Sequence, residues 1–462
     1  MKRLIKIFVP IGLGVLAVML TVAYWPTHTR PITPGDTSSP ALVEAGRYAA
    51  RAGDCIACHT APGGQPFAGG LPMQTPAGTI YTTNITPDPQ FGIGGYTLED
   101  FDRAIRYGIS KKGYSLYPAM PYPNYAHVSD ADMRALYAYF MHGVEPVAQP
   151  NRAVGMPWPL SMRWPMALWR KLFAPAVMGA DVQTPLAASS GSAPSIDRGA
   201  YLVEGLGHCS ACHTPRNLAF QEKGLTAADA DFLSGGAPLE GWVAKNLRSD
   251  AANGLGPWSE AELVQFLKTG RNSHTAVFGS MSEVVSNSLQ YLSDADLIAI
   301  AHYLKSLPPK DPTQKGFHSD AHAAQALWQG DDSARGAAVY VDNCAACHRT
   351  DGSGYTRFFP ALAGNTVVLG QDPSSLISIV LNGGTLPSLH TAPSSVTMPG
   401  FGWRLSDQQV ADVVTFIRGS WGNHADPVSA DQVSKLRDEG NRQTAGSDLG
   451  PNFNDASQKT AH

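Results

Sequence analysis

The chain carries little charge, and none of that charge is gathered into blocks. Only 16% of its 462 residues are charged, the formal net charge is −4, and the 34 Lys and Arg residues are spread along the sequence. A protein that binds nucleic acid needs a concentrated positive surface, so nucleic acid is not expected as a partner. With 43% hydrophobic residues the chain is not disordered, and its length suggests about three globular domains.

Cysteine is also scarce, and its positions are informative. The chain has six cysteines, and all of them fall in three C-x-x-C-H strings. No cysteine is left for a disulfide or a catalytic thiol, and no second pair completes a four-ligand zinc site. A thioredoxin-like pair would not explain a histidine after every pair. The strings therefore predict three covalently bound haem c groups, with the histidines as iron ligands. Their residues are Cys55, Cys58 and His59; Cys209, Cys212 and His213; and Cys344, Cys347 and His348.

The three strings lie in three copies of one sequence module. Small and apolar residues at helical spacing precede each string, and a helix with a serine at its N-cap closes each module. The regions between are rich in Gly and Pro, which favours loops over sheet. The sequence therefore predicts a mainly α protein with three tandem domains of the class I cytochrome c type. These domains are expected at residues 40–150, 195–310 and 328–425.

A sixth iron ligand must come from outside the strings. Met281 and Met398 are the single methionines of the second and third modules, and each lies between the haem motif and the closing helix. Met120 occupies the same place in the first module. A lone methionine usually fills a core, but the shared position predicts Met/His ligation, which raises the haem potential and suits electron transfer. His274 and His390 remain rival ligands.

Residues 1–25 contain the one long apolar run. Three cationic residues precede the apolar stretch Ile7–Trp25, which is nearly long enough to cross a bilayer. Cations stay on the cytoplasmic side, so the rest of the chain would be exported. A cleaved signal peptide is the alternative, with Thr21 and Ala23 as a small-x-small cleavage pair. Either reading predicts haem domains on the periplasmic side of a bacterial inner membrane.

Two further segments lie outside the modules. The linker at 151–194 contains the stretch Met156–Met178, which combines tryptophan with basic residues and is too interrupted by proline to span a membrane. Tryptophan and arginine are enriched at interfaces, so this stretch predicts a docking surface for a partner or the membrane. Packing on the chain's own modules is the alternative. Residues 187–195 resemble a flexible joint, and the polar tail at 426–462 is expected to be loose.

Several strings resemble one family. The first module carries TNITPDPQFGIGGYT from Thr83 and LYPAMPYPNY from Leu116, and the linker carries PLSMRWPMALWRKLFAP from Pro159. With the three haem motifs, these strings resemble the cytochrome c subunits of bacterial membrane-bound dehydrogenases, of the alcohol dehydrogenase and gluconate 2-dehydrogenase type. The likeness covers roughly residues 40–425. The haem motifs are specific for haem c rather than for this family, so the other strings are the more specific signal.

The resemblance implies an electron-transfer role with no substrate site on this chain. A separate catalytic subunit, either a quinoprotein, a flavoprotein or a molybdoprotein, would oxidise the substrate. This chain would pass the electrons to ubiquinone or another respiratory acceptor, through haems held by the three Cys-Cys-His sets and by Met120, Met281 and Met398. Two other functions stay open. One is a free-standing multihaem carrier to a terminal oxidase. The other is an autonomous catalytic cytochrome, which would need an open or unusually ligated iron.

Overall fold

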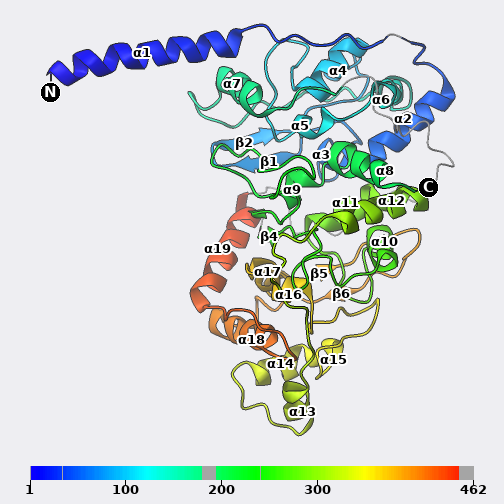
Figure 1. The fold of residues 1–462 in the computed structure, drawn as a ribbon, viewed down its shortest axis with the longest axis vertical. Helices are drawn as coiled ribbons and strands as arrows, with labels where there is room; N and C mark the ends of the chain where they lie inside the picture. The colour runs from blue at the N-terminus through cyan, green and yellow to red at the C-terminus, as the bar shows by residue number, and fades with distance from the viewer. Residues whose placement is uncertain (1, 34, 179–193, 240, 447–462) are drawn as a thin grey trace. The chain divides into compact units, whose positions relative to one another are not determined.

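The structure is a computed structural model that describes residues 2–33, 35–178, 194–239 and 241–446, with side chains between residues 10 and 440 (Figure 1). Contacts divide the chain into two compact units. The first comprises Met1–Ser192, Tyr201–His208 and Leu218–Gln221, and the second comprises Ala193–Ala200, Cys209–Asn217 and Glu222–His462. Helices dominate both units, so the expectation of a mainly α protein is confirmed. The division into three haem domains stays a prediction.

The first unit holds the N-terminal helix and the first haem motif. Its helices are α1 (Lys2–Tyr24), α2 (Pro40–Ala52), α3 (Cys55–Cys58), α4 (Leu98–Tyr107), α5 (Tyr122–Tyr125), α6 (Asp130–His142), α7 (Trp164–Phe173) and the π-helical turn η2 (Tyr201–Leu206). One antiparallel hairpin, β1 (Pro72–Thr75) with β2 (Gly78–Tyr81), interrupts the loop after the haem motif.

The second unit holds the other two haem motifs. Its first half contains α8 (Ile196–Ala200), α9 (Ser210–His213), β3 (Pro238–Leu239), β4 (Trp242–Val243), α10 (Glu260–Thr269), α11 (Ser280–Asn287), η3 (Leu289–Tyr291) and α12 (Asp294–Ser306). Its second half contains α13 (His322–Trp328), α14 (Ala337–Asn343), α15 (Ala345–His348), α16 (Thr366–Leu369), α17 (Ser374–Asn382), β5 (Gly384–Thr385), β6 (Thr397–Met398), α18 (Asp407–Gly419) and α19 (Ala430–Gly446). The regions expected to be loops thus also contain short antiparallel pairs, β3 with β4 and β5 with β6.

In each module the opening and closing helices meet at a glycine. A Cβ atom on Gly46 of α2 would lie 1.8 Å from the carbonyl oxygen of Ala135 in α6. A Cβ atom on Gly199 of α8 would lie 2.0 Å from the carbonyl oxygen of Ala299 in α12. Gly336, just before α14, has the same relation to α18. Only glycine lets the two backbones approach this closely, so the three crossings repeat one packing solution.

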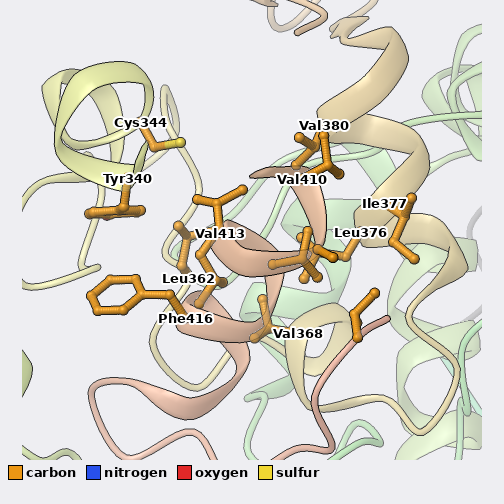
Figure 2. Close-up of a cluster of buried hydrophobic side chains, with 14 of the residues drawn as sticks. Tyr340, Cys344, Leu362, Val368, Leu376, Ile377, Val380, Val410, Val413 and Phe416 are labelled. Atoms are coloured by element: carbon orange, nitrogen blue, oxygen red, sulfur yellow. The ribbon is translucent and has the colours of Figure 1, made fainter. Parts of the chain in front are cut away.

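The third module shows how the haem motif is built into a core. Figure 2 shows side chains from α14, α17 and α18 meeting around Tyr340, Ile377 and Val413, which are fully buried. Cys344 belongs to the same cluster, and Met398 packs against it. The first cysteine of the motif and the candidate axial methionine therefore border one apolar core.

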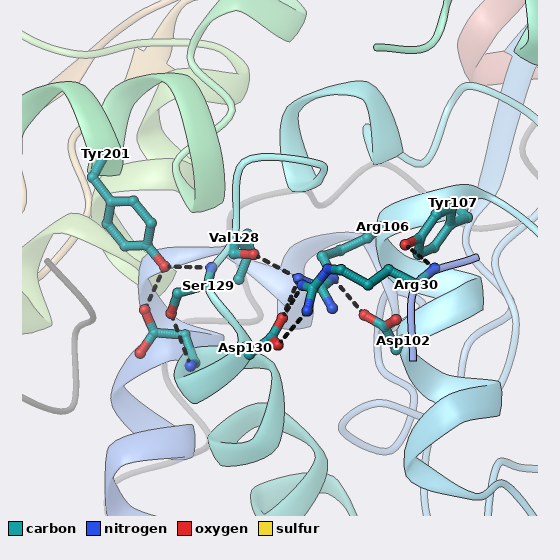
Figure 3. Close-up of polar contacts among 9 residues, drawn as sticks. Arg30, Asp102, Arg106, Tyr107, Val128, Ser129, Asp130 and Tyr201 are labelled. Carbon is teal, nitrogen blue, oxygen red and sulfur yellow. Dashed lines mark hydrogen bonds and ion pairs between the residues drawn. The ribbon is translucent and has the colours of Figure 1, made fainter. Parts of the chain in front are cut away.

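The segment that follows α1 is fixed to the first unit by a buried ionic network, which we call the Arg30 network (Figure 3). Arg30 donates to both carboxylate oxygens of Asp130, at 2.8 and 2.6 Å. Arg106 donates to Asp130 at 2.7 Å and also pairs with Asp102. Burial alone would raise the pKa of Asp130, but hydrogen bonds from Arg30 and Arg106 outweigh burial and lower it. Asp130 therefore stays ionised between the two guanidinium groups.

Helix α1 is present where the apolar run predicts a helix, and most of its described apolar side chains are exposed. Within the described residues, no helix combines the length and the apolar character that crossing a bilayer requires. The exposed side chains are Ile11, Leu13, Val15, Leu16, Val18, Met19, Val22 and Tyr24.

The tail departs from expectation. Helix α19 packs against α17 and α18, with Val433 fully buried. Arg437 donates to a carboxylate oxygen of Asp407 at 2.7 Å. The expectation of a loose tail is therefore wrong for residues 430–446, because Val433 and Leu436 pack in the apolar core and the hydrogen-bonded Arg437 attaches the polar helix. Residues 447–462, and 187–193 of the expected joint, lie outside the described part of the chain.

Candidate haem sites

Each C-x-x-C-H string folds as about one turn of helix. The N–H of the histidine donates to the carbonyl oxygen of the first cysteine, at 3.0 Å for His59 and 2.9 Å for His213 and His348. Residues at positions i, i+3 and i+4 of a helical turn share one face, so both thiols and the imidazole of a string lie on the same side. All six cysteines lie within the described residues, and none forms a disulfide.

The three imidazoles are oriented in the same way. In each of them, Nδ1 faces a backbone carbonyl oxygen further along the chain. Because a carbonyl only accepts, Nδ1 carries the proton and the lone pair of Nε2 is left for a metal ion. The bonds join His59 to Thr83 and His213 to Lys245 at 2.7 Å, and His348 to Pro360 at 2.9 Å.

Burial sets the protonation of the site. It lowers the pKa of His59, His213 and His348, which favours the neutral imidazole that binds iron. Burial also raises the pKa of the first thiol of each string, those of Cys55, Cys209 and Cys344, to about 12. Such thiols stay protonated at neutral pH and are poor nucleophiles or metal ligands as free groups.

This set of donors fits haem c. Two thiols on one face can bond the porphyrin, and an imidazole with a free Nε2 can bind its iron from the same side. The fit is found three times with the same local geometry, whereas a structural zinc site would need four convergent ligands.

Two of the candidate methionine ligands, Met281 and Met398, lie in different local structures. Met398 is on β6, where it pairs with Gly384, and it packs against the core that contains Cys344. Met281 lies in the first turn of α11 and packs against a second cluster, which we call the shared cluster. The buried members of the shared cluster are Val277, Val285, Leu386, Leu389 and Ala392.

Met120 lies in an irregular segment of the first module. Its N–H donates to the carbonyl oxygen of Tyr117 at 3.2 Å, and its own carbonyl accepts from the N–H of Tyr122 at 2.8 Å. Helix α5 follows directly. The three methionines are thus alike in sequence order and partial burial but not in backbone conformation, and their role as iron ligands stays a prediction.

The rival histidines have other partners. The ring of His274 stacks on Trp258 with centroids 5.3 Å apart and planes 8° apart, and its Nε2 lies 3.1 Å from a carboxylate oxygen of Glu262. His390 is exposed and meets Tyr291 edge-on at 5.7 Å. These contacts favour the methionines over the two histidines.

Sequence reasoning missed the carbonyl groups that orient the histidines. Thr83 and Lys245 carry two of them, and each is followed by an asparagine, Asn84 or Asn246. The side-chain oxygen of each asparagine accepts the N–H of the residue two positions on, at 2.9 Å. An asparagine directly after the carbonyl-bearing residue is therefore the sequence feature, shared by the first two modules, that could have identified these carbonyl groups. Pro360 of the third module has no such neighbour.

Comparisons with known proteins give relatives that are cytochrome c subunits. A sequence model of the family described as Cytochrome c matches residues 333–421. The chain is 60% identical over 406 residues to the gluconate 2-dehydrogenase cytochrome c subunit of Pantoea cypripedii, covering 87% of this chain and 91% of that protein. It is 56% identical over 403 residues to the alcohol dehydrogenase (quinone) cytochrome c subunit of Komagataeibacter europaeus, covering 87% and 85%. The corresponding subunit of Gluconobacter oxydans (strain 621H) is 53% identical over 402 residues, covering 87% and 83%.

Proposed function

The chain belongs to the family of dehydrogenase cytochrome c subunits, and on this premise we propose that it is the electron-transfer subunit of a complex whose separate catalytic subunit oxidises the substrate. The observation that carries the proposal is the site found three times in which Nδ1 of the histidine is bound to a backbone carbonyl oxygen and Nε2 is left free, with the histidine partly buried at His59 and His213 and buried at His348.

The chain would bind three haem c groups, one at each string. Haem supplies a one-electron couple when it is bound. The thiols would hold it covalently, and the histidines would bind iron through Nε2. Met120, Met281 and Met398 would supply the other iron ligand, a ligand type that raises the haem potential. The apolar core beside Cys344 would keep water away from the third site, and an iron held by both a histidine and a methionine would carry electrons rather than activate a substrate.

The electron donor would be a catalytic dehydrogenase subunit, either a quinoprotein, a flavoprotein or a molybdoprotein. The acceptor would be ubiquinone or another respiratory acceptor. The support is the names of the relatives: one is a subunit of gluconate 2-dehydrogenase, and others are subunits of a quinone alcohol dehydrogenase.

The haem domains would lie on the periplasmic side of the inner membrane, held there by residues 1–25. The cations before the apolar run support this orientation. The chain leaving α1 is also fixed to the first unit: Lys171 of α7 donates to the carbonyl oxygen of Trp25 at 2.5 Å, and Arg170 donates to Thr27 at 2.9 Å. Because α7 packs against α1, this part of the first unit would sit close to the membrane surface.

The stretch Met156–Met178 would provide a docking surface, but only part of it is free to do so. Trp169 packs edge-on against Tyr122, and its indole N–H donates to the carbonyl oxygen of Ala219 at 2.7 Å. Trp158, Leu160 and Leu172 are exposed. We therefore assign docking to these three exposed side chains, and internal packing to Trp169.

Mass spectrometry and ferric spectroscopy test the proposal together. The denatured mature chain should carry three haem additions, and two or fewer in a properly matured sample would contradict the three sites. The ferric protein should show the weak far-red band of methionine bound to iron and no high-spin signal. A high-spin signal from one haem would instead favour an autonomous catalytic cytochrome. Co-purification with a dehydrogenase subunit separates a complex from a free-standing carrier.

A further inference from the structure

A buried arginine links the second module to the third. Arg271 is only 8% exposed, and its guanidinium donates to carbonyl oxygens that all belong to the third module. Nη2 reaches Ala392 at 3.1 Å and Ser394 at 3.0 Å, and Nη1 reaches Arg357 at 3.4 Å. Burying a charged group costs free energy unless hydrogen bonds replace its water. The position of these carbonyl groups is therefore coupled to that of Arg271.

Two of these carbonyl groups lie in the loop that carries Met398. Strands β5 and β6 form a hairpin in which Gly384 pairs with Met398. The connection between the strands is ordered by a hydrogen bond from the N–H of Leu386 to the carbonyl oxygen of Val396, at 2.9 Å. Ala392 and Ser394 lie inside this connection. Arg271 therefore holds the loop whose last residue is the candidate axial ligand of the third haem.

On its own side, Arg271 begins the loop that leads to Met281. The N–H of Val277 donates to the carbonyl oxygen of Gly270 at 2.7 Å, and the hydroxyl of Thr269 donates to the carbonyl oxygen of Arg271 at 2.9 Å. These bonds fold the loop back onto the end of α10. Helix α11, with Met281 in its first turn, follows directly. One side chain thus lies at the base of both methionine loops.

The two loops also share apolar packing. The shared cluster takes Val277 and Val285 from the second module and Leu386, Leu389 and Ala392 from the third, and Met281 and Val396 pack against it.

Two polar contacts run beside the shared cluster. Asn365 donates to the carbonyl oxygen of His274 at 3.1 Å, and the N–H of His390 donates to the side-chain oxygen of Gln290 at 3.1 Å. A displacement of one loop therefore disturbs apolar and polar contacts of the other.

We propose that Arg271 is a positioning residue that joins the methionine loops of the second and third haem sites into one body, so that the axial ligation of these two haems is set jointly. The inference rests on methionine ligation in the proposed function. Met120 is not part of this link between the two methionine loops. Since the axial ligand and its surroundings set the haem potential, a change at one loop shifts the potential of both haems.

Proton NMR of the fully reduced, full-length protein tests the proposal, because the ring current of a haem moves the methyl signal of an axial methionine far upfield. The wild type should show three such signals. Fewer signals would contradict methionine ligation itself, a failure separate from that of the present inference. Met281→Ala and Met398→Ala assign two of the signals. If Arg271 joins the two methionine loops, Met281→Ala should also displace the signal of Met398.

The decisive variant is Arg271→Met, which keeps an unbranched apolar stem and removes the charge and the donors of the guanidinium. It should shift or broaden the signals of Met281 and Met398, lower the potentials of two haems and leave the signal of Met120 in place. Arg271→Lys keeps the charge but loses the forked donor geometry, and it should show the same changes at reduced size. The control is Arg335→Met, which removes an exposed arginine of the third module paired with Asp412 and should change nothing.

The proposal is overturned if Arg271→Met leaves both signals unmoved, or moves only that of Met281. If this variant fails to incorporate haem, Arg271→Lys and Asn365→Ala serve instead, since Arg271→Lys keeps a donor for the carbonyl groups and Asn365→Ala leaves Arg271 in place. Unchanged signals of Met281 and Met398 in both of these variants would equally overturn it.

Discussion

At the scale of single residues, the haem histidines depend on main-chain groups that must be held in place by other side chains. Asn84 shows how this is done for the first site. It is 2% exposed, and its amide donates to the carbonyl oxygens of Val147 and Gln149 at 2.8 and 3.1 Å. These bonds fix the backbone next to Thr83, whose carbonyl accepts from His59. The hydrogen bond of a metal-ligating histidine sets its ring orientation and basicity.

Asn84→Ala should therefore change both stability and the first haem. Removing a buried side chain with several hydrogen bonds should lower the free energy of unfolding by at least about 2 kcal/mol. It should also shift the potential of one haem out of three, because the carbonyl that orients His59 loses its support. Urea unfolding and a redox titration measure the two effects. Gln408→Ala, which removes an exposed hydrogen bond to Asp412 in the third module, is the control. A stability loss with no change of potential would mean that Asn84 is only structural.

The sequence singles out the candidate haem residues of the three strings, but it does not reveal the groups that orient the histidines. A cysteine pair followed by histidine has few chemical meanings, so the nine residues of the strings stand out. Thr83, Lys245 and Pro360 contribute only a carbonyl oxygen, which every residue possesses, and their identities therefore carry no signal. The methionines are an intermediate case. Their position in each module favours a role as iron ligands, but methionine also commonly fills protein cores.

At the scale of elements, helix α10 begins with a capping box whose glutamate, Glu262, has a strongly lowered pKa. Ser259 and Glu262 exchange hydrogen bonds with each other's backbone N–H, at 3.2 and 2.9 Å. The carboxylate of Glu262 also accepts from Ser273 and contacts His274 at 3.1 Å. Burial would raise the pKa of Glu262, but the hydrogen bonds from Ser273, Ser259 and His274 outweigh it and lower that pKa to about 2.

Glu262→Gln should destabilise the protein in a pH-dependent way. A folded-state pKa below the unfolded value of about 4.3 means that the carboxylate stabilises the fold above that pH, and that this stabilisation is lost as the pH falls toward 2. Glutamine keeps the capping geometry, and the site is partly solvated, so the difference should stay below about 1 kcal/mol. Urea midpoints at pH 7 and pH 3 measure it, with Glu260→Gln as the control. A gap between wild type and variant that does not shrink at low pH would contradict the assignment.

A second prediction concerns the glycine at the crossing of helices α8 and α12. Gly199→Ala would place a Cβ atom 2.0 Å from the carbonyl oxygen of Ala299, so α8 and α12 must separate. The free energy of unfolding should fall by about 1–3 kcal/mol or more. Gly419→Ala, at the end of α18, meets nothing within 4 Å and should be neutral or stabilising by up to about 1 kcal/mol. Thermal unfolding followed by circular dichroism compares the two, and equal effects would mean that the crossing tolerates a side chain.

The positions of the helices are easier to predict from the sequence than the tertiary contacts that hold them. The closing helices of the three modules have serine N-caps and apolar spacing over 13 residues, and they are found where predicted. The second module instead opens with a five-residue α8 that is followed by the π-helical turn η2. The hairpins β3–β4 and β5–β6 are two residues long on each side, too short for any alternating pattern. Helix α19 is polar along most of its length, and it packs through Val433, Leu436 and the hydrogen bonds of Arg437. These contacts depend on residues far apart in sequence.

At the scale of the whole molecule, the Arg30 network decides how the chain leaves α1. Residues between the end of α1 and the start of α2 could form a loose tether, but Arg30 binds Asp130, and the backbone N–H of Arg30 donates to the hydroxyl of Tyr107 at 3.0 Å. Ile32 is buried. If α1 remains as an anchor, the first unit is thus held at a fixed distance from the membrane rather than swinging on a flexible segment.

Arg30→Ala should convert this fixed segment into a loose one. Asp130 keeps Arg106 as a partner, so the free energy of unfolding should fall by only about 1–3 kcal/mol. Proteolysis of intact membranes with a protease of broad specificity should then cut between residues 25 and 40 and release the haem domains faster than from wild type. Arg47→Ala, which removes an exposed pair with Glu44, should release them at the wild-type rate. Equal rates for all three proteins would show that the network does not restrain the segment. A mature chain that begins near Tyr24 would show that residues 1–25 are a signal peptide, because no anchor would then remain to be cut from.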